Sequence, residues 1–271
     1  MLLPGAVHFG ASIRAYVAAT NADGLVVGAV VLSARARAGP LIGPRVAIHV
    51  IPPMRRQGIG QALLQTAESA ARSSGASALY AWLPVDIHES LKWSQLGFTQ
   101  SCHVQEFRSD LRRTLDHLTP LYEQALARNW VPTTARLVPL NRADPTAIAR
   151  LHLSQLGGDL DSLLARLRGQ TPPPYQPEIS PVIVLNGQVV AFMLALSIGN
   201  RTALIESTVV DPSLRGRWAN LWLRATAARR ALELGMHTVL YYTYDQHRDS
   251  QKIAARLQSL TRDLLEPYRL L

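Results

Sequence analysis

Cysteine, lysine and long apolar runs are scarce in this chain of 271 residues, and each scarcity excludes a class of protein. The single cysteine, Cys102, cannot form an internal disulfide and cannot build a cysteine-based zinc site alone. The longest apolar runs, 24–32 and 189–196, fall far short of the roughly 20 residues that span a bilayer. The first ten residues contain neither a basic region nor a long apolar region, which argues against a secretory signal. We therefore expect a cytoplasmic protein that has no membrane partner.

Histidine spacing and charge exclude further classes. The eight histidines show no spacing typical of a metal site, so no metal is expected. Apolar residues make up 48% of the chain and charged residues 17%, which excludes a disordered protein. The net charge is +9, and Lys92 and Lys252 are the only lysines among 28 basic side chains. This arginine excess fits either a compositional bias or a phosphate-bearing ligand, because arginine binds phosphate bidentately. No basic run with interleaved aromatic residues occurs, so a nucleic-acid partner is disfavoured.

The chain contains an internal repeat of strands and helices. Asp-Gly at 23–24 and Asn-Gly at 186–187 each lie between two apolar, β-rich runs, which predicts two hairpins. Each hairpin is followed by a third strand, a long helix that ends near Gly75 or Gly235, another strand and another helix. The order β-β-β-α-β-α therefore occurs twice, and it predicts an α/β fold. The helices are expected near 58–73, 88–96, 218–234 and 250–260.

The two halves of the repeat are unequal. A strand near 135–140 and two helices within 146–168 precede the second hairpin, whereas only some twenty residues precede the first. The first half continues into a strand near 103–108, and the second half ends without a matching strand. We therefore expect the halves to share an apolar interface or to exchange strands.

This organisation predicts two domains, 1–110 and 135–271, joined by a linking helix within 111–134. Pro120 is expected to kink that helix or to begin a new turn. The proline-rich stretch at 171–181 is either a stiff connector or the rim of a site.

The segment at 50–71 contains the strongest chemical signal. A buried strand leads into RRQGIG at 55–60, where a helix begins. Gly58 and Gly60 lack a Cβ atom, so backbone N–H groups can approach a ligand closely. The first N–H groups of a helix have no internal partner, and the helix dipole is positive at that end. A pyrophosphate fits such a turn.

This pattern, Val-x-Pro followed by Arg-x-x-Gly-x-Gly, resembles the acyl-CoA signature of the GCN5-related N-acetyltransferases. Its residues here are Val50, Pro52, Arg55, Gly58 and Gly60. The segment SLKWSQLGF at 90–98 looks like the closing helix and Leu-Gly-Phe turn of the same family. The order of elements agrees over roughly 15–108, and the whole chain resembles a tandem pair with a degenerate second copy.

The resemblance implies, in each half, a mixed central sheet flanked by helices. The sheet splays between its two central strands, and acyl-CoA lies in the gap with its acetyl carbonyl near the backbone amide of Val50. It also implies direct transfer of an acetyl group from acetyl-CoA, as co-substrate, to a primary amine. That reaction needs a neutral amine, a polarised carbonyl and a proton donor for the thiolate. The cofactor-binding residues implied are Val50, Ile51, Arg55, Arg56, Gln57, Gly58, Ile59, Gly60 and Gln61.

The first half departs from the family pattern at both proton-transfer positions. Trp93 occupies the place of a frequent tyrosine acid, and an indole N–H is a poor acid. Val46 occupies the place of a frequent glutamate base. His49 lies nearby, but strand alternation turns it to the opposite face unless a bulge intervenes. His49 is therefore either a catalytic base or a structural histidine.

The second half shows the reverse departure. Glu206 fills the position of the base, and it is either a catalytic residue or the partner of an arginine such as Arg201. Trp218 and Asn220 stand where glycines are expected, and we expect the tryptophan to obstruct the approach of a pyrophosphate to the backbone.

These observations favour an acyltransferase that moves an acetyl group from acetyl-CoA to a primary amine of a small molecule or a peptide. The alternative is a non-catalytic acyl-CoA-binding or interaction module, which the residues Val46 and Trp93 favour. The identity of the acceptor stays open, as does assembly into a homodimer.

Overall fold

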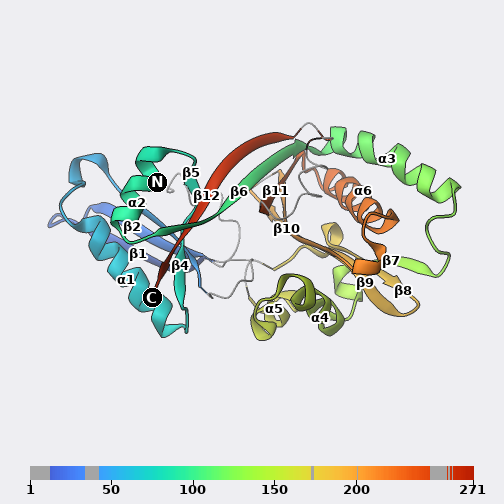
Figure 1. The fold of residues 1–271 in the computed structure, drawn as a ribbon, viewed down its shortest axis with the longest axis horizontal. Coiled ribbons are helices and arrows are strands. Elements are labelled where there is room, and N and C mark those ends of the chain that lie inside the picture. Colours follow the sequence, from blue (N-terminus) through green and yellow to red (C-terminus); the bar gives the residue numbers. More distant parts are fainter. Residues whose placement is uncertain are drawn as a thin grey trace. The chain divides into compact units, whose positions relative to one another are not determined.

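The computed structural model describes residues 13–33, 43–171, 174–199, 201–244, 255, 257 and 259–271. The chain divides into two compact units. Unit 1 contains Met1–Gln105 and Arg262–Leu271, and unit 2 contains Glu106–Thr261. Figure 1 shows the elements of both units along the chain.

Unit 1 is built on a mixed sheet of strand order β1-β2-β3-β4-β12-β6. Strands β1, β2 and β3 pair antiparallel, β3 and β4 pair parallel, and β12 pairs antiparallel with β4. Its elements are β1 (Ile13–Thr20), β2 (Val26–Ser33), β3 (Arg45–Val50), η2 (Pro52–Met54), α1 (Ile59–Ser73), β4 (Ala78–Tyr80), β5 (Leu83–Pro84), α2 (Ile87–Gln95), β6 (Thr99–Asp110) and β12 (Leu260–Leu270).

Unit 2 is built on strands that pair in the order β6-β11-β10-β9-β8-β7, to which β6 contributes its last residues. Strands β7 to β10 pair antiparallel in sequence order, and β10 pairs parallel with β11. Its elements are α3 (Leu111–Ala127), β7 (Ala135–Pro139), η3 (Leu140–Arg142), α4 (Pro145–Leu156), α5 (Leu160–Leu167), η4 (Pro177–Ile179), β8 (Pro181–Leu185), β9 (Gln188–Ile198), β10 (Thr202–Val210), η5 (Pro212–Leu214), α6 (Trp218–Glu233) and β11 (Thr238–Tyr244).

Both expected hairpins form, for local reasons. Between β8 and β9, Asn186 and Gly187 have φ angles of 50° and 80°, which suits a two-residue type I′ turn. Between β1 and β2, the Asn21 side-chain oxygen accepts hydrogen bonds from the backbone N–H groups of Asp23 and Leu25, at 3.1 and 2.9 Å. The α/β fold with mixed sheets flanked by helices is thereby confirmed in both units.

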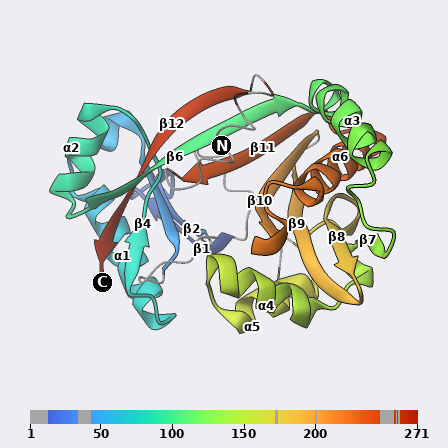
Figure 2. The ribbon, with the colours of Figure 1, turned by 45° about the vertical axis from the view of Figure 1, so that its right-hand side comes forward.

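The helices cover their sheets with apolar faces. In unit 1, α1 buries Leu63, Leu64 and Ala67 against β2, β3 and β4. In unit 2, α4 and α5 pack on one face of the sheet, and α6 packs on the other with α3 against it (Figure 2). Helix α3 continues through Pro120, which neither ends the helix nor begins a new one.

The C-terminal strand β12 is the main departure from the expected elements. The expectation that the second half ends without a closing strand is wrong, because Leu260–Leu270 forms β12. In unit 1, Tyr268 pairs with Tyr80 of β4, so β12 lies between β4 and β6. The unequal halves therefore do exchange a strand. The helix expected near 250–260 falls largely outside the described residues, and its last residue begins β12.

Candidate functional site

The sheet of unit 1 opens between its two central parallel strands. Among the described residues of β3 and β4, Arg45 and Tyr80 form the only backbone pair, and the Tyr80 N–H also donates to the Pro44 carbonyl at 3.0 Å. Beyond Arg45, toward Val50, the edge of β3 that faces away from β2 has no partner in the described strand β4. A ligand can hydrogen-bond to a strand at such an edge.

The backbone of Val50 faces this open edge. The Ile51 N–H donates to the Val27 carbonyl at 2.9 Å, so the backbone N–H of Ile51 points toward β2. Along a strand of an antiparallel pair, the N–H and C=O groups of successive residues point alternately toward and away from the partner strand. The N–H and C=O groups of Val50 therefore point away from β2. The Arg55 Nε donates to the Val50 carbonyl at 2.9 Å and fixes the start of the loop there. Within the described residues, the Val50 amide is therefore a free donor at the opening, whereas that of Ile51 is occupied.

The loop between β3 and α1 leaves the helix N-terminus uncapped. Gly58 is the N-cap residue with a φ of 81°, and no described side chain caps the first N–H groups of α1. Arg56 also has a positive φ, 61°, which is uncommon for a residue other than glycine. Unpaired N–H groups and the positive end of the helix dipole make this loop an anion site.

Packing within the protein does not account for the two loop glycines. A Cβ atom at Gly58 would meet nothing within 4 Å, and one at Gly60 would meet only the Val50 Cγ2 atom, at 3.8 Å, among the described atoms. By contrast, a Cβ at Gly28 would lie 3.1 Å from the His49 carbonyl oxygen and 3.1 Å from Leu63. A side chain at Gly28 would therefore have to displace its neighbours. At Gly58 the positive φ favours glycine, and at Gly60 the open space leaves room for a ligand.

The expected proton-transfer positions of unit 1 hold apolar residues, one in the core and one packed against it. Val46 is 1% exposed, and Trp93 packs edge-on against Phe98 with ring centroids 4.7 Å apart. The pairing of β2 with β3 has no bulge between Arg45 and Val50, so His49 stays on the face opposite to Val46, away from α1. The side chain of His49 therefore does not reach the α1 side of the sheet.

A buried carboxylate that the sequence pattern does not reveal lies where β3 and β4 part. Glu266 of β12 is fully buried and accepts hydrogen bonds from the Arg45 Nε at 3.2 Å and the Trp82 Nε1 at 3.0 Å. The Arg45 guanidinium lies 3.5 Å from the centre of the Trp82 ring, and the Cys102 Sγ lies 3.7 Å from Glu266. No local pattern identifies this cluster, because Glu266 is far from its partners in the sequence.

Unit 2 opens in the same way, and Glu206 lies at the opening. Strands β10 and β11 pair from Thr202 to Ile205, and a bulge against β9 falls between Ile205 and Ser207. Glu206 follows the last paired residue directly. Glu206 therefore lies where the paired part of these two strands ends.

Three donors occupy the Glu206 carboxylate. Arg166 of α5 donates to both carboxylate oxygens, at 2.6 and 2.8 Å, and the Tyr175 hydroxyl donates at 2.9 Å. The Glu206 and Arg166 side chains are only 5% and 11% exposed. Burial raises the pKa of Tyr175 well above its usual value and Glu206 raises it further, so this hydroxyl stays a donor. Hydrogen bonds from a bidentate guanidinium and a phenol therefore occupy both oxygens of this carboxylate.

The partners of Glu206 come from segments to which the sequence assigns no definite role. Arg166, rather than the expected Arg201, forms the ion pair. Tyr175 lies in the proline-rich stretch, for which the rim of a site was one of two interpretations.

His152 of α4 is also buried near this cluster and stacks on Phe192, with ring centroids 6.2 Å apart. Burial lowers the pKa of His152, while a backbone hydrogen bond at Gly157 and the charge of Glu206 oppose that change.

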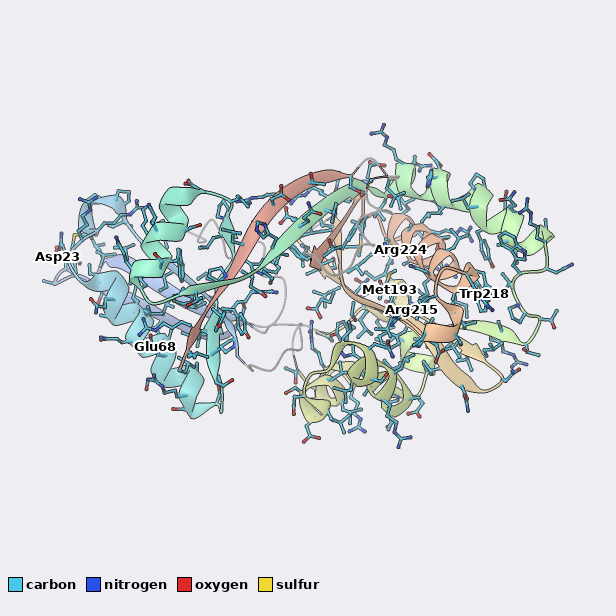
Figure 3. The ribbon with its side chains drawn as sticks, viewed as in Figure 1. Asp23, Glu68, Met193, Arg215, Trp218 and Arg224 are labelled. Carbon is cyan, nitrogen blue, oxygen red and sulfur yellow. The ribbon has the colours of Figure 1, made fainter. Side chains whose placement is uncertain are left out.

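The loop before α6 differs from the loop before α1 in its backbone conformation, and the side chain of Trp218 does not obstruct it. Trp218 is 4% exposed and packs in the core of unit 2 beside Trp222, so its indole does not cover the loop, and that expectation is wrong. Figure 3 shows Arg215 and Trp218 near the start of α6. Gly216 has a positive φ of 70°. Helix α6 nevertheless begins at Trp218, the residue that corresponds in the motif to Gly58, the left-handed N-cap of α1.

The sequence profile of the acetyltransferase (GNAT) family matches residues 8–98. That span includes β3, the loop and α1. The N-terminal part of the chain is a GNAT acetyltransferase domain. The protein is accordingly an acyltransferase, which is the activity of that family. No curated protein sequence matches the chain.

Solved GNAT structures resemble the whole chain in fold. A GCN5-related N-acetyltransferase from Sphaerobacter thermophilus superposes with a TM-score of 0.65 at 14% identity, covering 94% of this chain and 80% of that one. A tandem GNAT protein from the clavulanic acid biosynthesis pathway gives 0.63 at 20% identity, with coverage of 95% and 84%. The glucosamine N-acetyltransferase region of a fungal multi-domain GH3 β-N-acetylglucosaminidase gives 0.66 at 15% identity, covering 97% of this chain and 34% of that one.

Two other features are absent from the described residues. Across the part of the chain with described side chains, no group of three histidine, cysteine or acidic residues could hold a metal ion. No helix in the described ranges is long and apolar enough to cross a membrane.

Proposed function

We propose that this protein transfers an acetyl group from acetyl-CoA to a primary amine by direct attack of the amine on the thioester. The observation that carries the proposal is the uncapped N-terminus of α1 behind left-handed Gly58, next to the free Val50 amide. The N–H groups at 58–61 would bind the pyrophosphate, with charge from the two arginines before them. The Val50 N–H would polarise the thioester carbonyl, and a donor of this kind contributes about 3 kcal/mol to lowering the barrier.

In this proposal, unit 1 holds the co-substrate. Unit 1 consists of Met1–Gln105, which is most of the expected domain 1–110, together with Arg262–Leu271. The C-terminal domain, 135–271 by sequence, is a second GNAT-like copy whose loop starts α6 without a left-handed N-cap. A small-molecule or peptide amine in the cytoplasm is the acceptor class. The glucosamine N-acetyltransferase region among the fold neighbours supports small amines as the first acceptors to test.

The residues present imply that the amine loses its proton to solvent. Val46 and Trp93 occupy the usual positions of base and acid; Val46 is buried in the core, and the partly buried Trp93 packs against it. His49 and Glu206 are the two candidate bases from the sequence, and the donors around Glu206 favour a structural role for it. Orientation of the two substrates then supplies most of the rate enhancement. The rate should rise with pH toward the pKa of the acceptor itself.

The experiment measures release of the CoA thiol from acetyl-CoA over a panel of amines that includes glucosamine, a polyamine and a peptide N-terminus. We expect at least one amine to accelerate release above the rate without acceptor, with the product confirmed by mass spectrometry. The Gly58→Trp variant should lose this activity, because its side chain fills the anion site. If acetyl-CoA binds but no amine in the panel is acetylated, the non-catalytic acyl-CoA-binding module is the better description.

The alternative function has its own supporting observation. The same two residues, Val46 and Trp93, leave no acid or base side chain at the usual positions to move a proton, and the loss of such a group costs a typical enzyme 10²–10⁴-fold in rate. A binding module would retain the loop and the open sheet edge without needing that chemistry. The alternative predicts acetyl-CoA affinity that no amine alters.

A further inference from the structure

One buried polar cluster of unit 1 has no part in the proposed chemistry of acetyl transfer. It consists of Glu266 of β12, Arg45 of β3 and Trp82, which lies between β4 and β5. Glu266 is fully buried, and Arg45 is 8% exposed. A buried ion pair adds little net stability over apolar residues of the same size, because desolvation of the two charges offsets their attraction. Stability alone therefore does not account for this pair, which lies where β3 and β4 part.

Strand β12 keeps its neighbour at the point where β3 loses it. Tyr80 of β4 pairs with Arg45 on one side and with Tyr268 of β12 on the other. Beyond Tyr80, the pairing with β12 continues in the same register into β5, where Leu83 lies opposite Leu265. The chain from β4 to β5 therefore follows β12, whereas Arg45 is the last described residue of β3 that pairs with β4.

Glu266 lies at this junction and binds both sides of it. The register places Glu266 opposite Trp82, and the Trp82 Nε1 donates to the Glu266 Oε1 at 3.0 Å. The Arg45 Nε donates to the same oxygen at 3.2 Å. The Arg45 guanidinium also lies 3.5 Å from the centre of the Trp82 ring, a cation–π contact. One carboxylate therefore connects the end of the paired part of β3 to the residue with which the chain leaves β4.

A cluster of the same chemistry lies at the opening of unit 2. The Glu206 carboxylate accepts hydrogen bonds from Arg166 and from the Tyr175 hydroxyl, and the Arg166 guanidinium lies 4.3 Å from the centre of the Tyr175 ring. Each cluster thus combines a buried carboxylate, an arginine and an aromatic donor where two parallel strands part. Glu206 comes from β10 and Glu266 from β12, so the repeated order of elements does not by itself produce the likeness. The recurrence favours a role connected with the opening.

We propose that Glu266, Arg45 and Trp82 are positioning residues that set the width of the opening between β3 and β4, and thereby the affinity for the pantetheine arm of acetyl-CoA. The inference rests on the proposed binding of acetyl-CoA in unit 1. Paired strands lie about 4.8 Å apart, which leaves no room for a ligand between them, so the arm needs a gap of defined width. A gap that is already fixed in the free protein avoids the cost of ordering it on binding.

The experiment titrates two ligands into the full-length protein by calorimetry. Acetyl-CoA carries both a pyrophosphate and the pantetheine arm, whereas ADP carries the pyrophosphate without the arm. Trp82→Phe removes the indole N–H and keeps an aromatic ring, and Arg45→Met removes the guanidinium and keeps a long side chain. Because each variant loses a hydrogen bond to a charged group at the opening, we expect acetyl-CoA to bind about tenfold more weakly and the ADP affinity to stay within about twofold.

The matched control is Tyr175→Phe, which removes one donor from the buried carboxylate of unit 2 and keeps the ring. It should leave the affinity for both ligands unchanged, because it does not touch the opening of unit 1. Arg45→Lys restores a cation beside Glu266 and should recover part of the acetyl-CoA affinity that Arg45→Met loses. Retained ADP binding shows that unit 1 of each variant is folded, and Trp82→Phe keeps the test decisive if Arg45→Met does not fold.

A general loss of stability and a change in the opening give different results. The proposal is overturned if Trp82→Phe and Arg45→Met bind acetyl-CoA as tightly as the wild type, or if they lose affinity for acetyl-CoA and ADP in equal proportion. It is also overturned if Tyr175→Phe weakens acetyl-CoA binding as much as Trp82→Phe does. A wild-type protein that binds neither ligand would refute the proposed co-substrate site itself, and this inference with it.

Discussion

Replacing Glu206 by glutamine separates a structural role from a catalytic one. Glu206 accepts two hydrogen bonds from Arg166 and one from Tyr175, and its side chain is 5% exposed. Removing one member of a buried ion pair costs about 3–5 kcal/mol, because the other charge stays buried without a partner. Since Arg166 is 11% exposed and the glutamine can still accept from one donor, we expect the lower end of this range, about 3 kcal/mol.

A loss of this size is large enough to measure. For a domain of about 150 residues, each kcal/mol lowers the melting temperature by roughly 2–4 °C, so Glu206→Gln should melt about 6–12 °C lower. At a temperature where the variant remains folded, kcat/KM for acetyl transfer should stay within about threefold of the wild type, whereas loss of a general base would cost at least about 10²-fold.

The matched control is Arg166→Leu, which breaks the same ion pair and keeps the carboxylate. If Glu206 is structural, both variants lose similar stability and neither loses much activity. If only Glu206→Gln loses activity, by 10²-fold or more in kcat with the fold intact, then Glu206 is the base and its structural role is refuted.

Three further predictions follow from buried groups in the two units. Deleting Arg262–Leu271 should remove both the cooperative unfolding of unit 1 and its acetyl-CoA binding, because β12 lies between β4 and β6; a cooperative transition with binding intact would contradict this. Glu266→Gln should cost about 3 kcal/mol in chemical denaturation, whereas Glu233→Gln, in an exposed ion pair, should cost less than about 1 kcal/mol; equal losses would refute the burial argument. Because burial lowers the pKa of His152, the unfolded chain binds a proton there more readily, and stability should fall as pH drops below about 6.5. His152→Gln should flatten this pH dependence in thermal melts, and an unchanged profile would assign it to another group.

Local signals in the sequence predicted the elements that surround the candidate site. The turn glycines at 24 and 187 adopt positive φ angles that suit tight turns, and the structure has both hairpins. The glycine pair at 58 and 60 lies where β3 ends and α1 begins, as predicted. Each of these features depends on residues that are adjacent in the chain.

Contacts between distant segments could not be predicted in this way. The partners of Glu206 lie 40 and 31 residues away, and Glu266 lies 221 residues from Arg45. The polar and apolar pattern of the last eleven residues gave no sign that they form a strand in unit 1. The inward direction of Trp218 was also missed, since the motif alignment compares residue types and not the backbone conformation that sets where a side chain points.

Calorimetric titration of acetyl-CoA into two matched variants tests the central claim most directly. Gly58 and Gly216 have similar φ angles, 81° and 70°, and a Cβ atom at either would meet nothing within 4 Å among the described atoms. Tryptophan at either position therefore introduces similar strain and a similar bulky group at the start of a helix. Our account predicts that Gly58→Trp abolishes acetyl-CoA binding and that Gly216→Trp leaves the affinity unchanged. Binding that survives Gly58→Trp, or is lost only in Gly216→Trp, would contradict the assignment of the co-substrate to the loop before α1.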